Sequence, residues 1–131
     1  MERHFEKNLD ELKSGLQTMS ERALDALDCA VRALVEADPS QADGAFSREK
    51  EIDADEIRLE EMLIDFIALH QPVAGDLRMA FSLQDAVVDL ERIGDHATNI
   101  AQSAVTLCRL RQRPELLRLP EMAELAHRML R

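Results

Sequence analysis

The chain has 131 residues, with 26 acidic and 16 Lys or Arg side chains and a formal net charge of −10. This length is enough for one domain with a modest hydrophobic core, and the negative charge argues against nucleic-acid binding as the main function. Aromatic residues make up only 3% of the sequence, so the core must consist mainly of Leu, Ile, Val, Ala and Met. Four Gly, four Pro and the absence of strand-like alternation together indicate long helices.

The sequence also limits where the protein is found. No apolar run approaches the roughly 20 residues that a membrane-spanning helix needs, and residues 1–7 lack the apolar stretch of a secretory signal. We therefore expect a soluble cytoplasmic protein that meets a membrane only through its partners. Cys29 and Cys108 stand singly in helical patterns, which favours two small buried thiols over a disulfide.

The first predicted helix covers about residues 3–37. Apolar side chains recur there at spacings of three and four, which is typical of one buried helix face. This stripe consists of Phe5, Leu9, Leu12, Leu16, Met19, Ala23, Leu27, Ala30 and Leu34. The segment Asp38-Pro39-Ser40 ends the helix, because proline cannot continue it and disfavours helix at the preceding residue.

Two further long helices follow. The second covers about residues 40–70 and stops at Gln71-Pro72. The third begins at Pro72 or Val73 and continues to about residue 111, with Asp76 in its first turns complementing the helix dipole. Three such rods joined by short turns predict an all-α, up-down-up bundle of antiparallel helices.

The last part of the chain differs in charge. Residues 1–108 hold 23 acids and 10 Lys or Arg, whereas residues 109–131 hold six Arg and three Glu. We therefore divide the chain into a three-helix unit, residues 1–112, and residues 113–131, a linker followed by the first turns of a fourth helix. Its apolar face, unfinished at Arg131, would favour a homodimer or a higher oligomer.

Four carboxylates form a row on the second predicted helix. At 100° per residue they project within about 60° of one another, and they are Glu49, Asp53, Glu56 and Glu60. Apolar residues border the row on both sides: Ile52, Leu59 and Leu63 on one, Phe46, Ile57 and Ile64 on the other. This border favours a half-buried row that faces a groove. The alternative is a solvated charged face paired with Lys50 and Arg58.

The third predicted helix contains a second acidic pair, Glu91 and Asp95, with Gly94 between them. Residues four apart share a helix face, and two carboxylates held in this way repel each other. Glu49 and Asp53 have the same spacing. If the two pairs adjoin, four carboxylates would form an oxygen-rich site suited to Mg, Mn, Ca or iron. The alternative is a solvent-exposed polar stripe with Arg92 and Asn99.

Two segments of the sequence closely resemble the PhoU family of phosphate-signalling regulators. They are Gln71-Pro72-Val73-Ala74-Gly75-Asp76-Leu77-Arg78, and Asp89-Leu90-Glu91-Arg92-Ile93-Gly94-Asp95 followed by Asn99-Ile100-Ala101. The resemblance covers about residues 4–131. It implies tandem three-helix repeats, of which this chain holds one and the start of a second, so that it is either a piece of a longer protein or a short member of the family.

The resemblance also implies a function. It points to metal binding, including multinuclear iron, through Glu49/Asp53 and Glu91/Asp95, with Asp89 as an extra ligand. The metal could be iron, magnesium, manganese or zinc. No enzymatic turnover is implied. The expected partners are a phosphate ABC transporter ATPase and a sensor histidine kinase, and the expected role is to damp phosphate-starvation signalling.

Two other functions remain open from the residues. One is a structural or oligomeric bundle whose acidic side chains serve only solubility. The other is a ferritin-like di-metal oxidase, which needs two Glu-x-x-His motifs. Glu124 and His127 provide one such motif, and the sequence holds no second copy.

Overall fold

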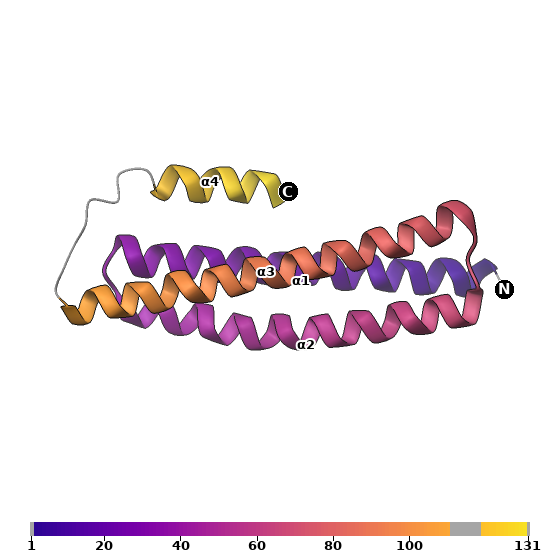
Figure 1. The fold of residues 1–131 in the computed structure, drawn as a ribbon, viewed down its shortest axis with the longest axis horizontal. Helices are drawn as coiled ribbons and strands as arrows, with labels where there is room; N and C mark the ends of the chain where they lie inside the picture. The colour runs from indigo at the N-terminus through magenta and orange to yellow at the C-terminus, as the bar shows by residue number, and fades with distance from the viewer. Residues whose placement is uncertain (1, 111–118, 131) are drawn as a thin grey trace.

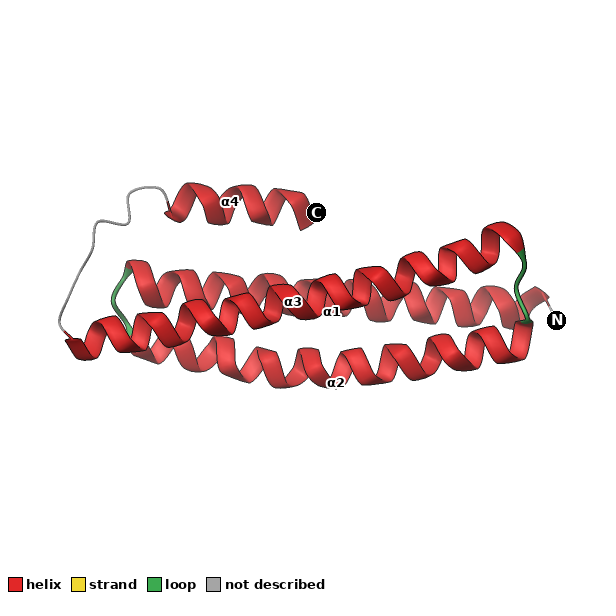
Figure 2. Ribbon diagram, viewed as in Figure 1, coloured by secondary structure: helices red, strands yellow, loops and turns green. Residues whose placement is uncertain are grey.

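The computed structural model describes residues 2–110 and 119–130, and every regular element in these ranges is an α-helix (Figure 1; Figure 2). The helices are α1 (Glu2–Val35), α2 (Pro39–His70), α3 (Ala74–Leu110) and α4 (Leu119–Leu130). The first three are long, run antiparallel to their neighbours in sequence, and lie side by side as an elongated bundle. The predicted all-α, up-down-up architecture is confirmed.

The turn between α1 and α2 differs slightly from its prediction. α1 ends at Val35, and Ala37 adopts the left-handed region at φ 51°. Asp38 then caps α2, because its side chain accepts hydrogen bonds from Ser40 N at 3.0 Å and Ser40 Oγ at 2.6 Å. These bonds lower the pKa of Asp38. Pro39 thus opens the second helix, a position where its missing N–H costs nothing.

The turn between α2 and α3 is longer than predicted, so that α3 begins later in the sequence, at Ala74. The prediction of a start at Pro72 or Val73 is wrong by one or two residues. Gln71 takes a left-handed conformation at φ 45° and donates its backbone N–H to Ile67 O at 2.9 Å, which ends α2. Ala74 also has a positive φ, 48°, so the regular helix begins only there. Asp76 lies in the first turn, as predicted.

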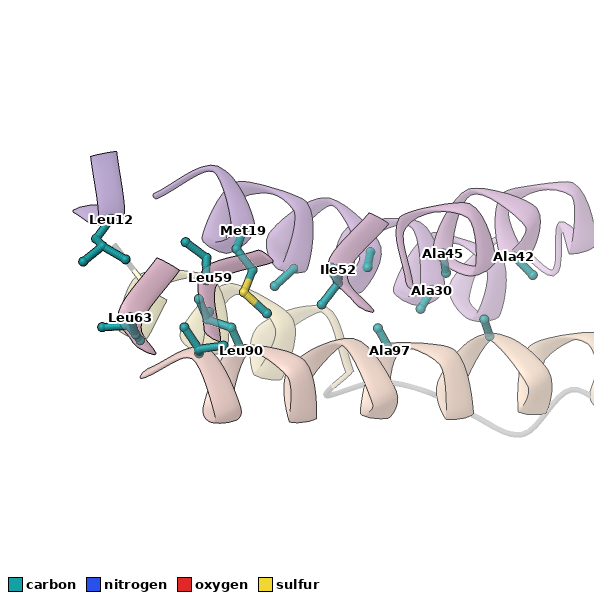
Figure 3. Close-up of a cluster of buried hydrophobic side chains, with 14 of the residues drawn as sticks. Leu12, Met19, Ala30, Ala42, Ala45, Ile52, Leu59, Leu63, Leu90 and Ala97 are labelled. Atoms are coloured by element: carbon teal, nitrogen blue, oxygen red, sulfur yellow. The ribbon is translucent and has the colours of Figure 1, made fainter. Parts of the chain in front are cut away.

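The core divides into two halves along the bundle. Leu12, Leu59, Leu63 and Leu90 fill one half with large side chains, and Met19 joins them (Figure 3). Alanines fill the other half, and they are fully or almost fully buried: Ala26, Ala30, Ala33, Ala42, Ala45, Ala97, Ala101 and Ala104. The predicted stripe on α1 therefore faces the core. Side chains as small as alanine allow the backbones of neighbouring helices to approach closely.

Helix α4 lies against α1 and contacts no other described helix. His127 Nε2 lies 3.6 Å from Asp28 Oδ2, and Leu130 packs against the core. The opposite face exposes Met122, Leu125 and Met129. This exposed stripe is the apolar face that the sequence predicted for the fourth helix. Oligomerisation through it stays a prediction. The predicted domain boundary at residue 112 lies outside the described residues.

Cys29 and Cys108 are free thiols, half-buried rather than fully buried, so the expectation of no disulfide is confirmed. Across the described ranges, no helix combines the length and the apolar character needed to cross a membrane.

Candidate cation site between α2 and α3

The candidate site lies on the seam where α2 and α3 run antiparallel. Gln84 Nε2 of α3 donates to Glu60 Oε1 of α2 at 3.1 Å. Further along, a Cβ added to Gly94 would lie 3.1 Å from Ile52 Cδ1, which is tighter than an ordinary van der Waals contact. The glycine inside α3, which costs helix stability relative to alanine, therefore allows the two helices to approach closely at the site.

Three carboxylates meet on this seam. One oxygen each from Asp53, Glu56 and Glu91 lies within 4.8 Å of the other two. Asp53 is exposed, whereas Glu56 and Glu91 are half-buried. We call these three residues the acidic cluster. Three like charges at this distance repel one another, so ionising all of them costs free energy unless a cation is bound.

The electrostatics of the cluster show this cost. Burial raises the pKa of Glu91 to about 7, and the hydrogen bond and charge of Asp95 and the charges of Glu56 and Asp53 add to the shift. Burial also raises the pKa of Glu56, with further contributions from Glu60, Asp53 and Asp95. At neutral pH, Glu91 is therefore partly protonated, in a place where a cation could replace the proton.

The arginines on α1 and α2 do not neutralise the cluster. Arg22, Arg48 and Arg58 pair instead with Asp25, Glu51 and Asp55. Within residues 2–110 and 119–130, no ion pair links a basic side chain to the acidic cluster or to Asp95. Partly exposed carboxylate oxygens without a basic partner suit a hard or borderline divalent cation that keeps some of its waters.

The structure brings together only part of the predicted site. Asp53 and Glu91 meet as expected, and Asp95 contributes to the raised pKa of Glu91. Glu49 and Asp89 are outside the acidic cluster. Metal binding by all five residues stays a prediction. Glu56 is the member that the predicted ligand set omitted. Its position in the acidic row was the available signal, because it lies one turn from Asp53.

The predicted environment of the acidic row is also partly right. Glu49, Glu56 and Glu60 are half-buried and Asp53 is exposed. The apolar border formed by Ile52, Leu59 and Leu63 is buried, but Ile57 and Ile64 on the other side are 60% and 66% exposed. The alternative pairing of Arg58 with the row is wrong, since Arg58 Nη2 contacts Asp55 Oδ1 at 3.0 Å.

Asp55 is a buried carboxylate that the sequence analysis missed. It is 1% exposed, and Arg22 Nη1 donates to both of its oxygens at 2.6 and 2.7 Å. The hydrogen bond and charge of Asp55 raise the pKa of Arg22. A signal was present, because Asp55 lies between Ile52 and Leu59 on the apolar side of α2. This ion pair joins α1 to α2.

The Glu-x-x-His motif in α4 is engaged elsewhere. Glu124 accepts from Arg128 Nη2 at 3.0 Å, and His127 lies beside Asp28 of α1. Neither is part of the acidic cluster. His70, at the end of α2, makes edge and tilted ring contacts with Phe5 and Phe66 and lies 3.0 Å from Asn8 Nδ2. These histidines therefore have structural contacts that do not involve the site.

Comparison with known proteins identifies the family to which this chain belongs. The sequence model of the PhoU domain matches residues 16–104, more than half of the chain. The chain belongs to the PhoU family. The two segments that suggested this family, around Asp76 and Glu91, both lie within the matched range.

Individual PhoU relatives are similar over most of this chain. It is 38% identical over 104 residues to a phosphate-specific transport system accessory protein PhoU homolog from Pseudomonas putida, covering 79% of the chain and 41% of the relative. A homolog of the same description from Aquifex aeolicus is 40% identical over 101 residues, covering 77% and 46%. The matched region thus spans less than half the length of each of these two relatives.

A solved PhoU structure shares the fold. The crystal structure of PhoU from Pseudomonas aeruginosa superimposes with a TM-score of 0.92 at 30% identity, covering 96% of this chain and 61% of that one. The three-helix bundle and α4 therefore correspond to an arrangement known in the PhoU family.

Proposed function

We propose that this chain is a regulatory adaptor of phosphate transport, and that it works in the cytoplasm through protein–protein contacts rather than by catalysis. Its relatives from Pseudomonas putida and Aquifex aeolicus are described as accessory proteins of phosphate-specific transport. By resemblance, the partners are the transporter ATPase and the sensor histidine kinase. The outcome of binding would be to damp phosphate-starvation signalling.

We further propose that a divalent or ferric cation binds the acidic cluster. The observation that carries this proposal is that one oxygen each of Asp53, Glu56 and Glu91 lies within 4.8 Å of the other two, with no ion pair to a basic side chain among the described residues. The donor set fits such a cation, because it consists of carboxylate oxygens that are partly open to solvent. A bound cation would offset the repulsion at the cluster and hold α2 and α3 in one register.

The adaptor role predicts co-purification with the transport system. The tagged protein is expressed together with the phosphate transporter ATPase of its own organism and purified through its tag. In the presence of Mn²⁺, the ATPase should co-purify with it. Because the cation is proposed to fix the seam, a chelator should reduce the recovery, as should Asp53→Asn/Glu91→Gln. Asp10→Asn, an exposed acid on α1, is the matched control and should behave as the wild type.

Two results would contradict this account in different ways. Failure of the wild-type chain to recover either the ATPase or the sensor kinase would contradict the adaptor role. Recovery that neither the chelator nor the double substitution changes would leave the adaptor role in place and contradict its dependence on the cation.

A further inference from the structure

Thr98 carries a buried hydroxyl that the fold alone does not explain. The residue is 8% exposed, and its Oγ1 has no hydrogen-bond partner among the residues that the structure describes. Buried polar atoms are nearly always hydrogen-bonded, and an exception calls for a reason such as an ion or a water. The hydrogen-bonding capacity of the Thr98 hydroxyl is therefore unused among the described residues.

The other two threonines of the chain show the usual solution. Thr18 Oγ1 donates to Ser14 O at 3.1 Å, and Thr106 Oγ1 donates to Gln102 O at 3.0 Å. Both use the carbonyl four residues earlier in their own helix, as threonines in helices commonly do. Thr98 makes no such bond. Its hydroxyl is thus available to another acceptor or donor.

The position of Thr98 relates it to the acidic cluster. It follows Asp95 by three residues and Glu91 by seven, so the three share one face of α3. The antiparallel register places Gly94 beside Ile52. Four residues further along α3 correspond to about four residues back along α2, so Thr98 lies level with residues 48 and 49. Glu49 is the predicted ligand that the acidic cluster leaves out.

We propose that Thr98 is a positioning residue of the cation site, whose hydroxyl hydrogen-bonds an oxygen ligand of the cation and extends the site toward Glu49. This inference rests on the proposed cation site, because it requires a bound cation. That ligand is either a carboxylate, which accepts from the threonine O–H, or a coordinated water, which donates to the threonine oxygen. Bonds of this kind orient ligands and strengthen their hold on the metal.

The test replaces the hydroxyl by a methyl group of the same shape. Thr98→Val is expected to weaken Mn²⁺ binding at pH 7.5 about 10-fold or more, measured by titration calorimetry. In metal-free protein, the same variant should unfold at an equal or higher urea concentration than the wild type, because a buried polar atom without a partner has been removed. A merely structural hydroxyl would give the opposite change in stability.

Two further variants make the result specific. Thr98→Ser keeps the hydroxyl and should restore Mn²⁺ affinity to within about two-fold of the wild type, since the hydrogen bond is retained. Thr106→Val, whose hydroxyl is bonded to its own helix, is the matched control and should leave Mn²⁺ affinity unchanged. Loss of affinity in the serine variant would contradict the inference.

The remaining outcomes separate this inference from the proposed function. If the wild type binds Mn²⁺ and Thr98→Val binds it equally well, the positioning role is wrong and the cation site stands. If Thr98→Val loses stability without metal, the hydroxyl is structural and the inference is overturned. If the wild type binds no Mn²⁺, both the site and the role of Thr98 are wrong.

Discussion

Replacing Glu91 with glutamine is expected to weaken cation binding at least about 10-fold and to stabilise the metal-free protein at alkaline pH. Glu91 is the member of the acidic cluster with the largest electrostatic cost, because burial and its neighbours raise its pKa to about 7. Glutamine keeps the shape and removes the charge. Binding and stability should therefore change in opposite directions.

The direction of the pH effect follows from the raised pKa. In the unfolded chain, a glutamate has a pKa of about 4.3, whereas in the folded chain that of Glu91 is about 7. The folded state holds its proton more tightly, so stability is greatest at low pH and decreases as the pH rises through 7. A shift of this size corresponds to about 4 kcal/mol, which solvent screening reduces to about 1–2 kcal/mol.

The measurement is urea unfolding at pH 5 and pH 8 with a chelator present. At pH 8, Glu91→Gln should exceed the wild type by about 1–2 kcal/mol, and at pH 5 the two should be nearly equal. Asp89→Asn is the matched control, because Asp89 is an exposed acid on α3 outside the acidic cluster. Equal stability of Glu91→Gln and wild type at pH 8 would contradict the electrostatic account of the site.

Replacing Arg22 with alanine is expected to destabilise the protein by about 2–4 kcal/mol. Asp55 is almost completely buried, and among the residues that the structure describes it would then retain one basic partner, Arg58, whose side chain is 55% exposed. A buried carboxylate that loses its main partner is costly, because neither water nor another cation replaces the two bonds from Arg22 Nη1. The loss should appear as a lower urea midpoint.

Arg48→Ala provides the matched control for Arg22. Arg48 pairs with Glu51 and Asp25, whose side chains are 39% and 62% exposed. Exposed pairs contribute little, so this variant should lose no more than about 1 kcal/mol. Equal losses for the two arginines would show that the buried ion pair with Asp55 does not hold α1 to α2.

Much of the fold follows from patterns within single segments. Apolar residues at spacings of three and four placed the first long helix, and Pro39 and Pro72 marked the turns that separate it from the second and third. The start of α3 was misplaced because Gln71 and Ala74 adopt positive φ, which neither residue type indicates. Tertiary packing rather than local preference determines such conformations.

The residues that meet at the site were harder to predict from the sequence than the helices. The shared spacing of the acidic pairs suggested that Asp53 and Glu91 would meet, and they do. The choice of Glu56 over Glu49 depends on the register between α2 and α3, which the contact of Gly94 with Ile52 helps to fix. The pairing of Asp55 with Arg22 likewise joins positions far apart in sequence. Patterns within one helix carry no information about such contacts.

The central claim is that the seam between α2 and α3 binds a cation through the acidic cluster, and metal analysis of protein purified without chelator tests it most directly. We expect bound metal in the wild type and in Asp10→Asn, an exposed acid on α1, and loss of the metal from Asp53→Asn/Glu91→Gln. Equal metal content in the wild type and the double variant would contradict it.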